Sequence, residues 1–177
     1  MTALLRLYAD IALLRRGPED LPASMAILVL SSAGYFLVNF AVSAVLPPIP
    51  GPWLAHLAVD VVFTFVWYWA LLQIFRRPER YLQTTSAVFG YQAVIAPLWI
   101  SSVWLVGHFR DNPSALFPVS LVGLAILVWT LTVNVRILRS ALEWPVAGCV
   151  VLVVLQTIAG QMLLIGFFPP APGAAPG

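Results

Sequence analysis

The chain has 177 residues, of which 61% are hydrophobic and only 9% are charged, and its formal net charge is +2. Ordinary soluble domains carry about 25% charged residues, so this composition excludes a soluble globular domain and predicts an integral membrane protein. The small net charge, without a basic patch interleaved with aromatic residues, gives no indication of a nucleic-acid partner.

Residues 1–17 are predicted to form an amphipathic helix that lies on the inner membrane surface. Apolar side chains recur at helical spacing along one side, at Leu4, Leu7, Ile11 and Leu14. Arg6 and Asp10 fall on the opposite side, four residues apart. Gly17 followed by Pro18 is expected to end the helix. The apolar side would also suit packing beneath a helical bundle, and the two placements are compatible.

Five apolar stretches follow, separated by charged residues or proline clusters. They cover residues 23–46, 53–75, 84–107, 115–136 and 145–168. Each is near or above the ~20 residues that a helix needs to cross a hydrocarbon core. Because lipid offers no partner to backbone N–H and C=O groups, each stretch is predicted to be helical. Residues 18–168 are therefore predicted to form an all-α integral membrane domain, a bundle of five transmembrane helices, and the Pro, Ala and Gly tail at 169–177 is predicted to be disordered.

Arginines indicate the topology, because short loops rich in arginine stay on the cytoplasmic side of a membrane. Eight of the nine basic residues fall on one side: Arg6, Arg15 and Arg16 before the first span, Arg76, Arg77 and Arg80 after the second, and Arg136 and Arg139 after the fourth. Only Arg110 falls on the other side. The N-terminus is therefore predicted to be inside and the C-terminus outside, with the five loop arginines making cytoplasmic contacts. The absence of lysine indicates a GC-rich bacterium, and hence a bacterial inner membrane.

A polar site is expected at the outer ends of the second and third spans. Asp60 is the only acid within a predicted span, and an ionisable residue inside a membrane is a functional hypothesis by default. His56 precedes it by four residues, and His108 and Asp111 lie at the same outer surface. Histidine with carboxylate could hold a metal ion or relay protons, although both histidines lie too near the surface for a haem. The simpler interpretation, without metal, is a wetted Asp60 bonded to His56 or Arg110.

Amide side chains within or beside the spans favour contacts between helices. They are Asn39, Gln73, Gln92, Asn134, Gln156 and Gln161. In lipid such amides hydrogen-bond across helices, contributing about 0.6 to 2 kcal/mol each. They could instead line a polar path, but their spacing singles out no track. Pro97, deep inside the third span, is expected to kink it.

The stretch "RRPERYLQTTSAVFGYQAVIAPLW" begins with basic residues that end the second span, and a short polar segment follows them. An aromatic-Gly-Tyr element, Phe89, Gly90 and Tyr91, then opens the third span, and Pro97 follows. Together with five spans and arginine-bearing cytoplasmic loops, this resembles the Yip (Ypt-interacting protein) family, whose bacterial relatives are small inner-membrane proteins. The Asp-Leu-Tyr-Gly-Pro stretch typical of eukaryotic members is missing. The resemblance implies a non-enzymatic membrane protein that works through contacts with other membrane proteins or lipid.

The sequence leaves three functional hypotheses. The first is a non-enzymatic scaffold or accessory subunit of a membrane assembly, without a cofactor, because no G-x-S-x-G, Walker A or H-E-x-x-H motif is present. Its partners would be lipid and other integral membrane proteins, and a homo-oligomer stays open. The second is a small transporter, channel or lipid-handling protein with a path that begins at Asp60 and His56. The third is a metal-dependent membrane enzyme using His56, Asp60 and His108.

Overall fold

The computed structural model describes residues 2–45 and 52–169, and no strand occurs within these ranges. The helices are α1 (Thr2–Ala12), α2 (Met25–Val45), α3 (Trp53–Ile74), α4 (Tyr81–His108), α5 (Pro113–Leu142) and α6 (Val146–Phe167). Short 3-10 turns at Pro18–Asp20 and Pro78–Arg80 precede α2 and α4. The predicted disordered tail at 169–177 and the proline-rich connector at 47–52 fall almost wholly outside the described residues.

Helices α2 to α6 confirm the prediction of an all-helical chain with five helices long and apolar enough to cross a membrane. Two of them are longer than predicted. Helix α4 begins at Tyr81, three residues before the expected span, and α5 runs from Pro113 to Leu142 rather than over 115–136. At 1.5 Å per residue, α5 is about 45 Å long and exceeds a hydrocarbon core of about 30 Å. The helix therefore exceeds that depth by about 15 Å.

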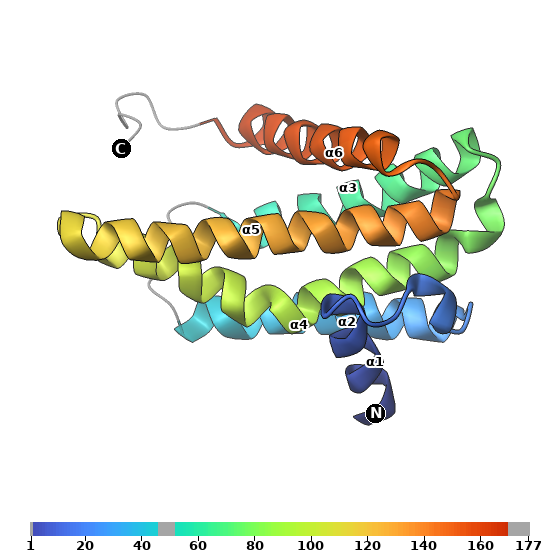
Figure 1. Ribbon diagram of the computed structural model, residues 1–177, viewed down its shortest axis with the longest axis horizontal. Coiled ribbons are helices and arrows are strands. Elements are labelled where there is room, and N and C mark those ends of the chain that lie inside the picture. The colour runs from blue at the N-terminus through green and yellow to red at the C-terminus, as the bar shows by residue number, and fades with distance from the viewer. Residues whose placement is uncertain (1, 46–51, 170–177) are drawn as a thin grey trace.

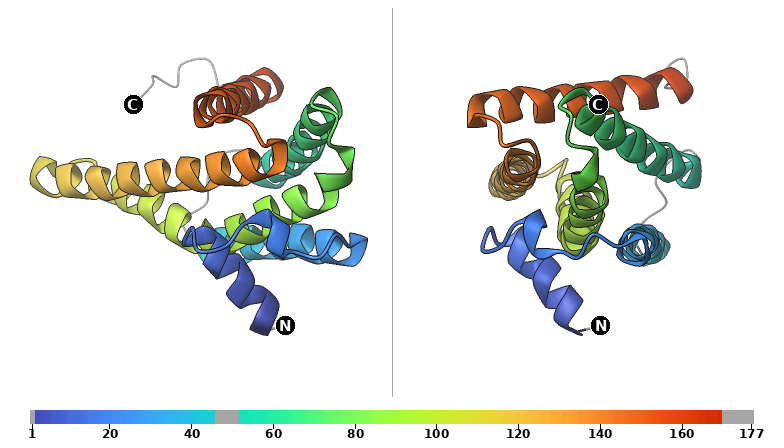
Figure 2. Two further views of the ribbon diagram at one scale, coloured as in Figure 1. Left: turned by 45° about the vertical axis from the view of Figure 1, so that its right-hand side comes forward. Right: turned by 90° about the vertical axis from the view of Figure 1, so that its right-hand side faces the viewer.

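Helix α4 occupies the centre of the bundle. Figure 1 shows the five long helices running across the view beside one another, and Figure 2 shows α4 with α1, α2, α3 and α5 around it. Helix α6 packs on α5 and α3. The connectors from α3 to α4 and from α5 to α6 meet at one end, which carries Arg76, Arg77, Arg80 and Arg139 and is called the arginine-bearing end (Figure 1).

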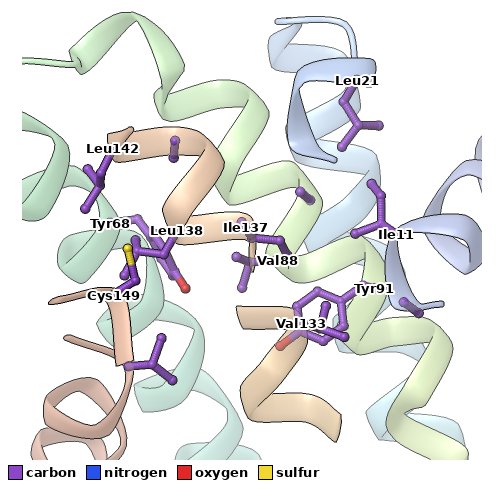
Figure 3. Close-up of a cluster of buried hydrophobic side chains, with 14 of the residues drawn as sticks. Ile11, Leu21, Tyr68, Val88, Tyr91, Val133, Ile137, Leu138, Leu142 and Cys149 are labelled. Atoms are coloured by element: carbon purple, nitrogen blue, oxygen red, sulfur yellow. The ribbon is translucent and has the colours of Figure 1, made fainter. Parts of the chain in front are cut away.

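The best-packed part of the core lies toward the arginine-bearing end. Leu138 of α5 and Cys149 of α6 are fully buried beside Tyr68 of α3 (Figure 3). Leu72 of α3 is fully buried in the same cluster. Elsewhere large apolar side chains face outward on all five long helices: Leu37, Val62, Val103, Phe117 and Met162 are examples. In water so much exposed apolar surface would drive association, whereas lipid-facing helices require it. The burial pattern therefore fits a multi-pass membrane protein.

Helix α1 lies crosswise to the long helices, nearer to the arginine-bearing end (Figure 1). Its Tyr8 and Ile11 side chains are buried in the core, and the Trp129 Nε1–H donates to the Ala12 carbonyl at 2.8 Å. The Tyr8 hydroxyl lies 2.5 Å from Ser31 Oγ on α2. Gly90 of α4 makes this docking possible, because a Cβ atom there would collide with the Tyr8 ring.

Helix α1 ends earlier than predicted, at Ala12 rather than Gly17. Leu14 adopts a φ of 61°, a left-handed conformation that a leucine reaches only at a cost of about 1 to 2 kcal/mol. The amide N–H of Arg15 then donates back to the Asp10 carbonyl at 2.8 Å, which closes the last turn. The guanidinium of Arg136 donates to the Leu14 carbonyl. A contact from α5 therefore stabilises the turn that ends α1 after Ala12.

Replacing Gly90 tests the docking of α1. Alanine normally stabilises a helix relative to glycine by about 1 kcal/mol, but the collision with Tyr8 should make Gly90→Ala destabilising by about 1 to 3 kcal/mol. Thermal unfolding of the purified protein in detergent measures the difference. Gly107→Ala, on the same helix with open space around the glycine, is the matched control and should be neutral or slightly stabilising. Equal behaviour of the two variants would contradict the contact.

Candidate functional site

A cavity of about 300 Å³ lies among all five long helices. Each helix contributes at least one polar side chain that can ionise or hydrogen-bond: Asn39 from α2, Asp60 from α3, Gln92 from α4, Asn134 from α5, and Gln156 and Gln161 from α6. These side chains are far apart in sequence and meet only through the packing of the bundle. The structure thus brings together, around one space, the single intramembrane acid and five of the amides singled out from the sequence.

The cavity begins about 10 Å from the arginine-bearing end, at Val153 of α6, and extends through the middle of the bundle toward the opposite end. Asp60 comes seven residues after Trp53, which begins α3 at that opposite end, and so lies about 10 Å along the helix. Gln161 and Leu164, near the far end of α6, complete the wall there. The fully buried core around Leu138 closes the other end. The bundle is therefore packed at one end and hollow toward the other.

Asp60 is held by a tyrosine from the neighbouring helix. The Tyr35 hydroxyl donates to Asp60 Oδ2 at 2.9 Å, and this is the one hydrogen bond of the Asp60 side chain within residues 2–45 and 52–169. The Tyr35 ring in turn packs on Phe89 of α4, with 5.5 Å between ring centroids. No Arg or His side chain lines the cavity among the described residues, and the chain has no lysine. The protein therefore orients the carboxyl group without supplying a counter-charge beside it.

The amides around the cavity are incompletely satisfied. The Tyr68 hydroxyl of α3 donates to Gln156 Oε1 of α6 at 3.2 Å, which is a contact between helices. Gln92 Oε1, Asn134 Oδ1 and the Tyr91 hydroxyl are buried, and none has a hydrogen-bond partner in the described part of the chain. The Tyr91 hydroxyl lies close to both amide side chains, but not in a geometry that forms a full hydrogen bond with either oxygen. An unpaired buried group costs about 1 to 3 kcal/mol, so this wall is suited to partners from a solute or water.

The remaining predicted site residues lie elsewhere. His56 Nδ1 is 3.0 Å from the Pro52 carbonyl oxygen, and its ring stacks on Phe168 at 4.0 Å. His108 is exposed and stacks on Trp104 at 5.0 Å. Asp111 is exposed, and neither histidine nor Asp111 lines the cavity.

The contacts of Asp60 and the histidines bear on the metal hypothesis. Asp60 pairs with a tyrosine rather than with His56 or Arg110. Within residues 2–45 and 52–169, no group of three or more His, Cys, Asp or Glu side chains is placed to hold a metal ion. The arrangement is therefore better suited to hydrogen bonding and charge pairing than to metal coordination.

The arginine-bearing end is tied together by ion pairs. Arg77 Nη2 and Arg80 Nη2, from the connector between α3 and α4, lie 2.7 Å and 2.5 Å from the two oxygens of the Glu143 carboxylate. Arg80 also donates to the Ser140 carbonyl. Glu143 belongs to the connector between α5 and α6, so these bonds join two connectors that are far apart in sequence.

The other predicted cytoplasmic arginines differ in their contacts. Arg136 holds the Leu14 carbonyl. Arg76 and Arg139 are exposed, and neither guanidinium makes a hydrogen bond or ion pair with the described residues.

Removing the charge of Glu143 tests whether its ion pairs with Arg77 and Arg80 hold the two connectors together. Glu143→Gln should lower the free energy of unfolding by up to about 1 kcal/mol at low salt, and the loss should shrink at high salt, because these pairs are solvent-exposed. Chemical unfolding in detergent at two salt concentrations measures this. Glu79 is an exposed acid in the connector between α3 and α4 and makes no ion pair among the described residues. Glu79→Gln should therefore leave the free energy of unfolding unchanged. A salt-independent loss at Glu143, or equal losses at both positions, would argue against this role of the ion pairs.

Comparison with known proteins adds no further constraint. No protein-family model, curated protein or solved structure matches the chain. The resemblance to the Yip family stays a prediction, and the function has to be argued from the cavity.

Proposed function

We propose that the chain is a bacterial inner-membrane protein that binds a small solute in the cavity among the five long helices and carries it across the bilayer. One observation carries the proposal: Asp60 and amides from the other four long helices converge on the same space. Intramembrane ionisable residues mark substrate and ion paths. A volume of about 300 Å³ is at the lower end of ligand-binding cavities.

Solute binding accounts for the amides better than the scaffold hypothesis does. Amides that serve only to join helices should pair across them. Gln156 does so with Tyr68, but the buried oxygens of Gln92 and Asn134 have no partner in the described chain. Amides that hold a partner protein would lie on an outer surface, whereas the Gln92 and Asn134 oxygens are buried within the bundle. The activity we propose is therefore non-enzymatic transport.

The arginine distribution orients the proposed carrier. With eight of nine arginines inside, the N-terminus is cytoplasmic, the C-terminus is external, and the hollow part of the bundle lies toward the outside. The core around Leu138 and the pairs of Glu143 with Arg77 and Arg80 then close the cytoplasmic side. In this orientation the structure corresponds to a state closed toward the cytoplasm, and release inward requires the joined connectors to separate.

Helix α1 completes the proposed placement in the membrane. It lies crosswise to the spans (Figure 1), as a helix at a membrane surface would. Leu5 and Leu13 are exposed, so they can insert at the boundary between the lipid headgroups and the acyl chains. Arg6 and Arg15 are exposed as well, and each basic side chain near an anionic leaflet contributes about 1 kcal/mol of attraction.

Cysteine labelling tests whether the cavity is wetted from outside. Because a thiol reacts as the thiolate and needs water to form it, Thr157→Cys, which lines the cavity, should react in intact cells with a membrane-impermeant maleimide. Ile158→Cys is the control, because Ile158 is exposed on α6 but does not line the cavity, and lipid should protect it. Both variants are made in a Cys149→Ala background. Labelling of neither position, or of Ile158→Cys alone, would overturn the outward-open cavity.

Solute uptake tests the transport step itself. Proteoliposomes that contain the purified protein should accumulate at least one member of a panel of radiolabelled small cations, neutral solutes and anions faster than protein-free liposomes. Double substitution of the cavity amides, Gln92→Leu with Asn134→Leu, should reduce that uptake by tenfold or more while thermal unfolding shows an intact fold. The absence of uptake for every class would contradict transport and return the scaffold hypothesis to first place.

A further inference from the structure

The cavity has a single source of charge. Asp60 is the only charged side chain on its wall among the described residues. Arg110, the one arginine on the same side of the expected topology, is exposed and makes no ion pair with the described chain. The Tyr35 hydroxyl supplies one hydrogen bond at 2.9 Å, which orients the carboxyl group but carries no positive charge. When ionised, the Asp60 carboxylate must therefore find its counter-charge in the solute.

Electrostatics then discriminate between classes of solute. Charges interact far more strongly in a low-dielectric interior than in water, so an anion would be repelled by Asp60. A neutral solute would leave the carboxylate uncompensated, an arrangement that membrane interiors disfavour. A singly charged cation both pairs with Asp60 and leaves the occupied site neutral. The charge of the wall thus favours a monovalent cation.

The rest of the wall favours an organic cation over a metal ion. Aromatic rings from three helices line the same cavity: Tyr35 from α2, Phe63 from α3, and Tyr91 and Trp99 from α4. Aromatic faces attract ammonium groups by cation–π interaction, most strongly when water is excluded. Hard metal ions such as Ca²⁺ require six to eight oxygen ligands, and one carboxylate surrounded by aromatic rings does not supply them. An ammonium group with an apolar body matches both kinds of surface.

We propose that the cavity selects small organic ammonium ions, which it recognises by pairing their charge with Asp60 and by packing their alkyl groups against Tyr35, Phe63 and Trp99. This inference rests on the proposed function and names the substrate class of the same site. The volume of about 300 Å³ limits the solute to a small molecule. Buried acceptors without partners, Gln92 Oε1 and Asn134 Oδ1, can receive N–H or O–H donors of the solute once their side chains turn toward it.

Matched isosteres test the charge requirement. The probes are choline and phenethylammonium, their neutral counterparts 3,3-dimethylbutan-1-ol and 2-phenylethanol, and the anion 3,3-dimethylbutanoate. Binding is measured by calorimetry on the protein in lipid nanodiscs, and uptake is measured in proteoliposomes. Each cation should bind at least tenfold more tightly than its neutral counterpart, and the anion should not bind.

Substitutions separate the contributions of charge and aromatic faces. Asp60→Asn keeps an oxygen that accepts from Tyr35 but removes the charge, so cation binding should fall tenfold or more. Trp99→Leu keeps an apolar wall but removes a ring, so it should weaken the cations several-fold and leave the neutral counterparts unchanged. Trp104→Leu, on the same helix but outside the cavity wall, should affect neither. Because Trp99→Leu is read against a neutral probe, it remains informative even if Asp60→Asn fails to fold.

The outcomes distinguish the two proposals. Binding or uptake of the neutral probes or of the anion at least as strong as that of the cations would overturn the substrate class and leave transport standing. Equal loss of cation and neutral binding in Trp99→Leu would likewise exclude recognition through the aromatic face. Failure of every class of solute, together with an unlabelled Thr157→Cys, would overturn the proposed function itself.

Discussion

Lipid supplies neither hydrogen-bond partners nor counter-ions, and this constraint organises the whole structure. It forces each long apolar segment into a helix, because only a helix satisfies its backbone internally. It also acts on side chains, so every polar group in the bundle must find a partner within the protein or in something the protein binds. The pair of Tyr68 with Gln156 is the first kind of solution. Asp60, with one tyrosine and no cation beside it, is the second.

The same constraint explains why the two ends of the bundle differ. At the arginine-bearing end, apolar side chains such as Leu138 and Leu142 fill the interior. The charged groups stay in the connectors, where Glu143 forms solvent-exposed pairs with Arg77 and Arg80. Such exposed pairs contribute little energy, so they can break without unfolding the bundle. Toward the other end, polar groups replace apolar ones and a cavity replaces the core. The carrier that we propose needs this asymmetry, since one closed end and one open end define the direction from which a solute enters.

The number and approximate bounds of the long helices could be predicted because the demand of lipid is local to each segment. The cavity could not be predicted in the same way. Asn134 and Gln92 were recognisable as polar residues within spans, but their convergence depends on how each helix is rotated. These spans are apolar nearly all round, so the sequence carries no periodic signal for that rotation. Tyr35 was missed for the same reason, because its role beside Asp60 exists only between helices. The early end of α1 also depends on a distant contact, from Arg136 to the Leu14 carbonyl.

The aromatic-Gly-Tyr element of α4 shows how surface and cavity are connected. Three consecutive residues point in different directions around one helix turn. Phe89 packs on the ring of Tyr35, the tyrosine that holds Asp60. Gly90 leaves the space that Tyr8 of α1 fills, and Tyr91 lines the cavity. A shift of α1, which we place at the membrane surface, would therefore press on the same helical turn that positions the carboxyl group, because packed interiors transmit strain. The single missing Cβ atom therefore couples α1 to the helical turn that borders the cavity.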